Sequence, residues 1–110
     1  MSNWVRVGKI SECPPGMVLE RVAGERVIAL CNAEGKLFAI DGVCPHQGGP
    51  LGEGELVGTT LGCPWHGWQF DITTGQHQLN RRVRQPQFPV RVEGDDIYVN
   101  IEPDAAPAAE

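Results

Sequence analysis

The sequence predicts an all-β domain whose short antiparallel strands form a sandwich or a small barrel. Gly and Pro account for 14 and 9 of the 110 residues, and long helices could not carry so many because each one destabilises a helix interior. Short runs of β-branched, aromatic and aliphatic residues recur between turn signals along the chain. The length suits one domain, and no repeat or linker divides it.

The last expected strand has the clearest pattern. Ile97, Val99 and Ile101 take every second position, and Tyr98 and Asn100 stand between them. This alternation is typical of a strand with one buried face. In chain order, and separated by turns that contain Gly, Pro or Asp, the expected strands are residues 4–7, 17–22, 26–31, 36–40, 56–61, 68–71, 89–92 and 96–101.

The charge and hydropathy of the chain exclude several classes of function. A net charge of −5 argues against binding to nucleic acid, which requires clusters of Lys and Arg, and against binding to an anionic membrane surface. No apolar run approaches the roughly 18 residues of a membrane-spanning helix. Residues 1–6 lack the apolar stretch of a signal peptide, so we expect a cytoplasmic protein. In a reducing compartment, Cys close to His indicates metal binding or catalysis rather than disulfides.

Two Cys–His pairs stand out in a segment rich in Gly and Pro, between residues 42 and 67. Cys44 precedes His46 by two positions, Cys63 precedes His66 by three, and 16 residues separate the pairs. A Pro follows each Cys, and Gly residues surround each His, which excludes a helix. The four side chains are therefore expected on two loops that face each other.

Two Cys and two His suit more than one kind of centre. In a 2Fe–2S centre, two thiolates complete one iron and two imidazoles the other, with sulfides bridging them. A zinc site with two Cys and two His also has four ligands in a tetrahedral arrangement. Zinc sites usually have paired Cys with the His pair elsewhere, whereas each pair here is mixed, so the spacing favours iron and sulfur. Four unligated residues in this arrangement would be a coincidence.

The pattern Cys-x-His, then 16 residues, then Cys-Pro-x-His-Gly and an aromatic-rich strand resembles the Rieske iron–sulfur motif. The chain is most similar to the small stand-alone Rieske ferredoxins that serve bacterial oxygenases. The resemblance implies one 2Fe–2S cluster held by Cys44, His46, Cys63 and His66. It also implies an antiparallel β base that carries a small cluster-binding subdomain made of two loops, at about 42–50 and 62–68. We expect this domain to span residues 1–101, and residues 102–110, which lack an apolar pattern, to form a disordered tail.

Three positions depart from the high-potential Rieske proteins of respiratory complexes. Those proteins have an extra Cys in each loop, joined as a disulfide, and a Ser after the Gly of the second loop. Here Gly49 and Trp65 stand where the cysteines would be, and Trp68 replaces the Ser. Without that hydroxyl donor the reduced cluster is stabilised less, so we expect a low reduction potential, as in a ferredoxin.

The remaining sequence contains no catalytic motif. Because all four ligating side chains are used and no nucleophile, phosphate-loop or dinucleotide motif is present, we expect a one-electron carrier and not an enzyme. The resemblance implies that an NAD(P)H-dependent flavoprotein reductase supplies electrons to this carrier, a monomer. A terminal oxygenase, such as one in aromatic hydrocarbon catabolism, would receive them. Two alternatives stay open: a Rieske-type small subunit of an assimilatory nitrite reductase, and a zinc-stabilised interaction domain.

Partner docking is expected around the His ligands, because outer-sphere electron transfer slows steeply with distance. Gln47, Pro50 and Trp65 are uncharged neighbours of the ligands and would form the core of the interface, with Trp65 as its anchor. The alternative is that Trp65 packs inward and only supports its loop. Acidic residues further out form either a solvated face or a rim that steers a basic partner: Glu53, Glu55, Asp95 and Asp96.

Other noticeable residues have structural interpretations. Cys31 lies on an apolar strand and is expected in the core, and Cys13 is expected as an unligated thiol in a turn. His77 follows a turn and is expected at the surface. Residues 85–89 form either a rigid connector or, by resemblance, the Pro-containing third loop that covers the cluster.

Overall fold

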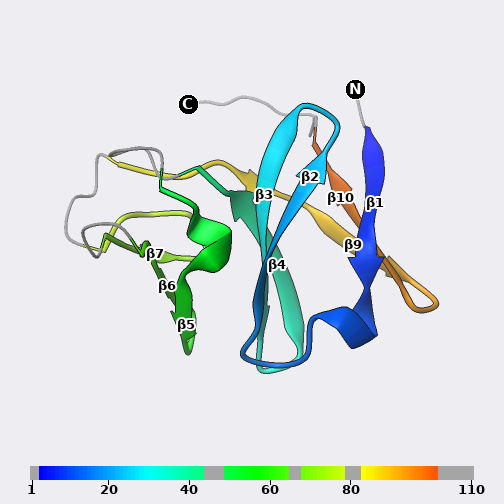
Figure 1. Cartoon of the computed structure of the whole chain (residues 1–110), viewed down its shortest axis with the longest axis horizontal. Helices are drawn as coiled ribbons and strands as arrows, with labels where there is room; N and C mark the ends of the chain where they lie inside the picture. Colours follow the sequence, from blue (N-terminus) through cyan, green and yellow to red (C-terminus); the bar gives the residue numbers. More distant parts are fainter. Residues whose placement is uncertain (1–2, 44–48, 65–67, 79–82, 102–110) are drawn as a thin grey trace.

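Three antiparallel sheets lie side by side in the computed structural model, which describes residues 3–43, 49–64, 68–78 and 83–101 (Figure 1). Their strand orders are β1-β10-β9, β2-β3-β4-β8 and β5-β6-β7. The elements are β1 (Trp4–Lys9), η1 (Ile10–Glu12), β2 (Val18–Ala23), β3 (Arg26–Ala33), β4 (Lys36–Asp41), η2 (Leu51–Glu53), β5 (Glu55–Val57), β6 (Thr60–Gly62), β7 (Gln69–Asp71), β8 (Gln87–Phe88), β9 (Val90–Glu93) and β10 (Asp96–Asn100). The predicted all-β, antiparallel class is confirmed. None of the helices among these residues is long and apolar enough to cross a membrane.

The strand predicted at 56–61 is wrong, because two strands occupy this region. Glu55–Val57 and Thr60–Gly62 pair with each other, with Val57 opposite Thr60. Gly58 in the turn has a φ of +62°, a left-handed conformation that costs glycine little. The apolar residues on both sides of this turn made the hairpin resemble one continuous strand.

Residues 85–89 contribute more than a connector. Gln87 and Phe88 form β8, which pairs with the end of β4 through Ile40 and Ala39. The N–H of Asp41 extends this pairing by donating to the carbonyl of Pro86 at 2.9 Å. Prolines flank this two-residue strand, as an edge strand tolerates. Because the strand is so short and lies between prolines, the sequence pattern did not predict it. The chain segment after the third sheet is thereby fastened to the strand that leads into the first loop.

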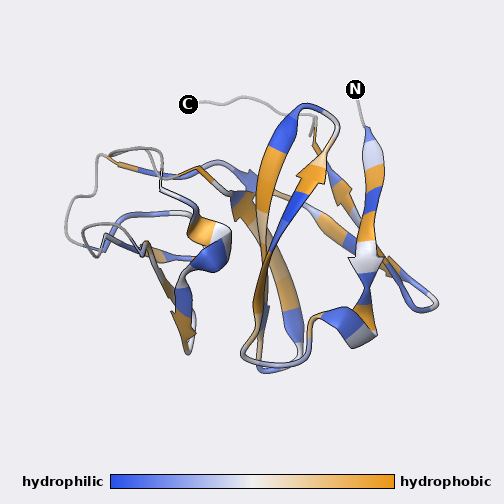
Figure 2. Ribbon diagram, viewed as in Figure 1, coloured by the Kyte–Doolittle hydropathy of each residue, from blue (hydrophilic) through white to orange (hydrophobic). Residues whose placement is uncertain are grey.

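The central strand β3 supplies side chains to two cores. Ile28 and Leu30 pack with residues of the β1-β10-β9 sheet, whereas Ala29 and Cys31 pack with residues of η2, β6 and β7. This division follows from the alternation of side chains along a strand. Figure 2 shows the resulting run of hydrophobic residues along β3. The third sheet therefore packs against the central sheet.

Candidate metal centre

Described residues close the bases of both expected loops. At the first loop, Val43 and Pro50 form an antiparallel bridge, and the N–H of Leu51 donates to the carbonyl of Gly42 at 2.9 Å. At the second loop, the N–H of Cys63 donates to the carbonyl of Trp68 at 2.7 Å. Each loop therefore starts and ends at neighbouring points on the body of the protein.

The two loop bases lie against each other. Gly54, just after η2, is so close to the carbonyl of Gly62 that a β carbon on it would collide with that oxygen. Beside this contact is a hollow of about 320 Å³ whose lining includes Glu53, Glu55 and Cys63. The chain leaving the first loop thus meets the chain entering the second, as a site with ligands on both loops requires.

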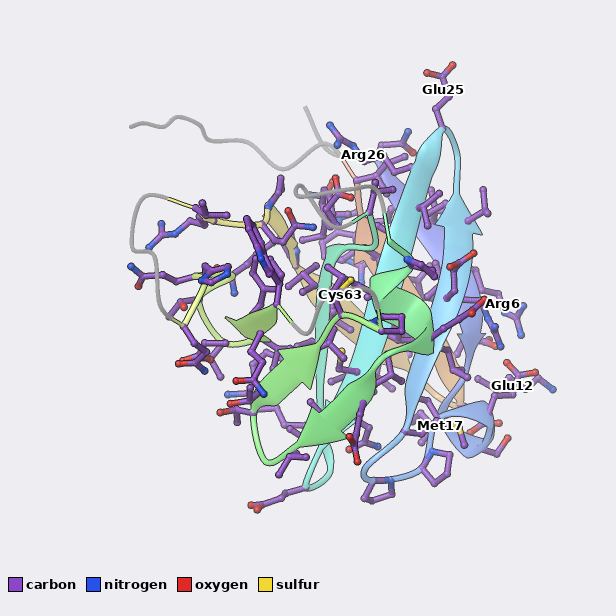
Figure 3. The ribbon with its side chains drawn as sticks, turned by 60° about the vertical axis from the view of Figure 1, so that its left-hand side comes forward. Arg6, Glu12, Met17, Glu25, Arg26 and Cys63 are labelled. Atoms are coloured by element: carbon purple, nitrogen blue, oxygen red, sulfur yellow. The ribbon has the colours of Figure 1, made fainter. Side chains whose placement is uncertain are left out.

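Cys63 is the one predicted ligand that falls within the described residues. It is 4% exposed and packs in the apolar core with Leu51, Leu61 and Phe70. Figure 3 shows Cys63 inside the molecule, whereas Arg6 and Glu25 lie at its edge. A largely buried thiolate sulfur at the base of a loop is a suitable ligand for iron. The other predicted ligands, Cys44, His46 and His66, and the docking residues Gln47 and Trp65 lie outside the described residues.

Cys13 and Cys31 are both buried and form no disulfide, and the core position predicted for Cys31 is confirmed. Burial raises the pKa of both, that of Cys31 to about 12, so neither is a reactive thiolate at neutral pH. They belong to different cores, Cys13 with Leu30 on one side of β3 and Cys31 with Cys63 on the other. Within the described part of the chain, no three His, Cys, Asp or Glu side chains gather into a separate metal site.

The prediction that His77 lies at the surface is wrong. The residue is only 7% exposed, and its ring makes edge contacts with Trp68 and Phe70 at centroid distances of 4.4 and 5.3 Å. The reason is the turn that follows β7, which brings His77 back into a bridge with Phe70. Trp68, at the exit of the second loop, is thus part of an aromatic group that supports this loop from below.

The expected acidic rim divides between two places. Glu53 and Glu55 are exposed beside the hollow next to Cys63. Asp95 lies in the turn after β9, and Asp96 is the first residue of β10. Figure 1 shows this turn and β10 on the other side of the central sheet from β5. Asp96 is also paired with Arg6 at 2.9 Å. Of the four, only the two glutamates are close to the loop bases.

Comparison with known proteins agrees with this geometry. A family model described as a Rieske [2Fe-2S] domain matches residues 3–99. The ferredoxin component of an alkene monooxygenase system from Xanthobacter autotrophicus is 40% identical over 81 residues, 73% of this chain and 66% of that protein. The ferredoxin component of a naphthalene 1,2-dioxygenase system from Pseudomonas aeruginosa is 31% identical over 101 residues, 90% of this chain and 96% of that protein.

Solved structures share the fold. A chain in a complex of reduced oxygenase and oxidized ferredoxin in carbazole 1,9a-dioxygenase aligns with a TM-score of 0.80 at 28% identity, covering 88% of this chain and 92% of that one. A chain from Mycobacterium tuberculosis described as a nitrite reductase small subunit aligns with a TM-score of 0.83 over 91% of this chain and 96% of its own. At 21% identity the second likeness concerns the fold alone.

Proposed function

The chain belongs to the Rieske [2Fe-2S] family, and on that premise we propose that it is a one-electron carrier for a terminal oxygenase. Its cofactor is one Rieske-type 2Fe–2S cluster, so the zinc alternative is set aside. We assign the thiolates of Cys44 and Cys63 to one iron and the imidazoles of His46 and His66 to the other. The assignment rests on the resemblance of the motif, and it is supported by the close approach of Gly54 to Gly62, between the two loops, with Cys63 buried beside it.

The cluster, when bound, accepts one electron and passes it on without breaking or forming a covalent bond. The protein's own residues prepare the site for this exchange. Leu51, Leu61 and Phe70 exclude water from the inner side of Cys63. The hydrogen bond from Leu51 to Gly42 closes the base of the first loop, and the one from Cys63 to Trp68 closes the base of the second. A rigid, water-poor surrounding is what keeps the reorganisation on electron transfer small.

We propose two partners, an NAD(P)H-dependent flavoprotein reductase as donor and an oxygenase as acceptor. The oxygenase is supported by the names of the relatives, which are ferredoxin components of monooxygenase and dioxygenase systems. The nitrite reductase alternative is supported only by a likeness of fold. We also propose that the carrier works as a monomer in the cytoplasm, where a reducing environment would keep thiols such as those of Cys13 and Cys31 free.

Docking at the loops remains part of this proposal. Pro50 is half-buried at the base of the first loop, and the exposed Glu53 and Glu55 follow it. These two carboxylates would attract a basic partner, and the uncharged Gln47 and Trp65 would form the contact. Trp65→Ala should then slow electron delivery to the oxygenase while the visible spectrum stays unchanged. Bleaching of the cluster in that variant would indicate a supporting role instead.

The function is tested with the purified protein. Its reduced form should give the electron paramagnetic resonance of a Rieske cluster, and it should accept electrons from a reductase with NADH and return them to an oxygenase. Ala at Cys44, His46, Cys63 or His66 should abolish the native spectrum, since ligands and loops fold together. Cys13→Ser and Cys31→Ser are the matched controls and should keep it. Loss of the cluster in either control would contradict the ligand assignment.

A further inference from the structure

Gln85 lies where three segments of the site meet. It is 3% exposed and stands just before β8. Its side-chain Nε2 donates to the carbonyl oxygens of Asp41 and Val43, both at 2.8 Å. Its backbone N–H donates to the carbonyl of Gly75, in the turn after β7, at 2.6 Å. A primary amide has two N–H donors, so this one amide serves both carbonyls at the end of β4.

The two carbonyls that receive these bonds belong to the last described residues before the first loop. Asp41 ends β4, and Val43 immediately precedes Cys44. The carbonyl of Val43 is in the same peptide unit as the nitrogen of Cys44, so a bond to it restrains that peptide plane. The direction in which the chain enters the first loop therefore depends on Gln85.

The approach of Gln85 to the turn after β7 is equally specific. Gly75 has a φ of +80°, and a β carbon on it would collide with the carbonyl of Gln85. Glycine is thus needed at this turn for Gln85 to come so close. The same turn begins at Asp71, the last residue of β7, which follows the second loop. Gln85 consequently connects the entrance of the first loop to the strand that leaves the second.

We infer that Gln85 is a positioning residue that fixes the first loop relative to the second and so sets the geometry of the iron–sulfur centre. This inference rests on the proposed function, in which Cys44 ligates iron. Gln85 acts through the backbone at residues 41–43, to which its side-chain amide donates. Its loss should therefore change the cluster's spectroscopic signature and lifetime, and not only the stability of the fold.

The chain offers a control two residues further on, at Gln87, which makes the same number of side-chain hydrogen bonds but is exposed where Gln85 is buried. Gln87 also donates from its Nε2 to two carbonyls, those of Ile72 at 3.3 Å and Thr73 at 2.7 Å. Both acceptors belong to the turn after β7, and neither belongs to the first loop. Gln87→Met thus removes as many side-chain hydrogen bonds as Gln85→Met, with a side chain of similar length, and leaves the entrance of the first loop untouched.

The experiment compares the cluster-loaded variants with the wild type by electron paramagnetic resonance and by the rate of cluster loss to an iron chelator. Gln85→Met should shift and broaden the g values and accelerate loss about tenfold, the factor that corresponds to about 1.4 kcal/mol, within the range expected for the net loss of two hydrogen bonds. Gln87→Met should match the wild type. Gln85→Asn, whose shorter amide cannot span both carbonyls, should fall between them.

The inference is wrong if Gln85→Met matches the wild type, or if Gln87→Met causes the same changes. It is also wrong if neither Gln85 variant folds under conditions in which Gln87→Met does, because Gln85 is then a general folding residue. A wild-type protein without a Rieske signal would instead overturn the proposed function, and this outcome is visible before any variant is compared.

Discussion

Replacing Gly54 with Ala tests the contact between the two loop bases. The backbone of Gly54 has a φ of −81° and a ψ of −171°, a conformation that any residue adopts, so Ala introduces no strain of its own. Ala is unfavourable instead because its methyl group has no room. A β carbon there would lie under 3.0 Å from the oxygen of Gly62, at 3.0 Å from its carbonyl carbon and at 3.1 Å from the oxygen of Leu51. All three are backbone atoms, so no side chain can rotate away.

The cost follows from this collision. Adding a methyl group to a well-packed site costs about 1–3 kcal/mol, and displacement of two backbone segments belongs at the upper end. For a domain of this size, about 3 kcal/mol corresponds to a fall of roughly 12 °C in the melting temperature. Because the displaced carbonyl immediately precedes Cys63, we also expect the cluster to bleach at a lower temperature.

The assay is thermal unfolding followed by circular dichroism and by visible absorption. Gly62→Ala is the matched control, since a β carbon there would have the oxygen of Glu55 at 3.8 Å and Cγ of Gln69 at 4.0 Å as its nearest neighbours. That variant should be neutral, or gain about 0.4–1 kcal/mol by restricting the unfolded chain. A Gly54→Ala melting temperature within about 2 °C of the wild type would refute the reasoning, as would an equal fall in Gly62→Ala.

Four further predictions concern the core and the cluster. Burial raises the pKa of Cys31 to about 12 in the folded protein, so as the pH rises the thiol loses its proton in the unfolded chain before it does so in the folded one. The free energy of unfolding measured in urea should therefore fall as the pH rises from about 9 toward 12. Cys31→Ala should remove that part of the slope. The reduction potential measured in a redox titration should be about −150 mV rather than about +300 mV. A value above zero would contradict the explanation that the absence of the Ser hydroxyl lowers the potential. Trp68→Ser should raise the potential if its hydroxyl reaches the cluster, and an unchanged value would count against the same account. Phe70→Ala should cost about 3–5 kcal/mol in urea unfolding because the ring is fully buried, and a loss below about 1 kcal/mol would show that the third sheet is not held by this core.

Local information in the sequence is sufficient for part of this protein. The ligand motif is a matter of spacing, so Cys44, His46, Cys63 and His66 stand out without any structure. The load of Gly and Pro excludes long helices, and the alternation at the end of the chain predicts a strand with one buried face. The core position of Cys31 follows from an uninterrupted apolar run, which the structure buries on both faces of β3.

Contacts between distant segments decide the rest. His77 is buried because a turn returns it to Phe70, and no feature of its neighbours in the sequence records that pairing. Gln85 is unremarkable in a polar, Pro-rich stretch, yet its amide reaches carbonyls 44 and 42 residues away. Burial and hydrogen bonding of a polar side chain depend on which backbone groups the fold leaves without partners, and only the assembled sheets determine that. The sequence by itself therefore determined which residues we propose as cluster ligands, because their motif is a matter of local spacing. The tertiary structure alone decided which side chains reach the backbone at the bases of the two loops, because those contacts join segments far apart in the chain.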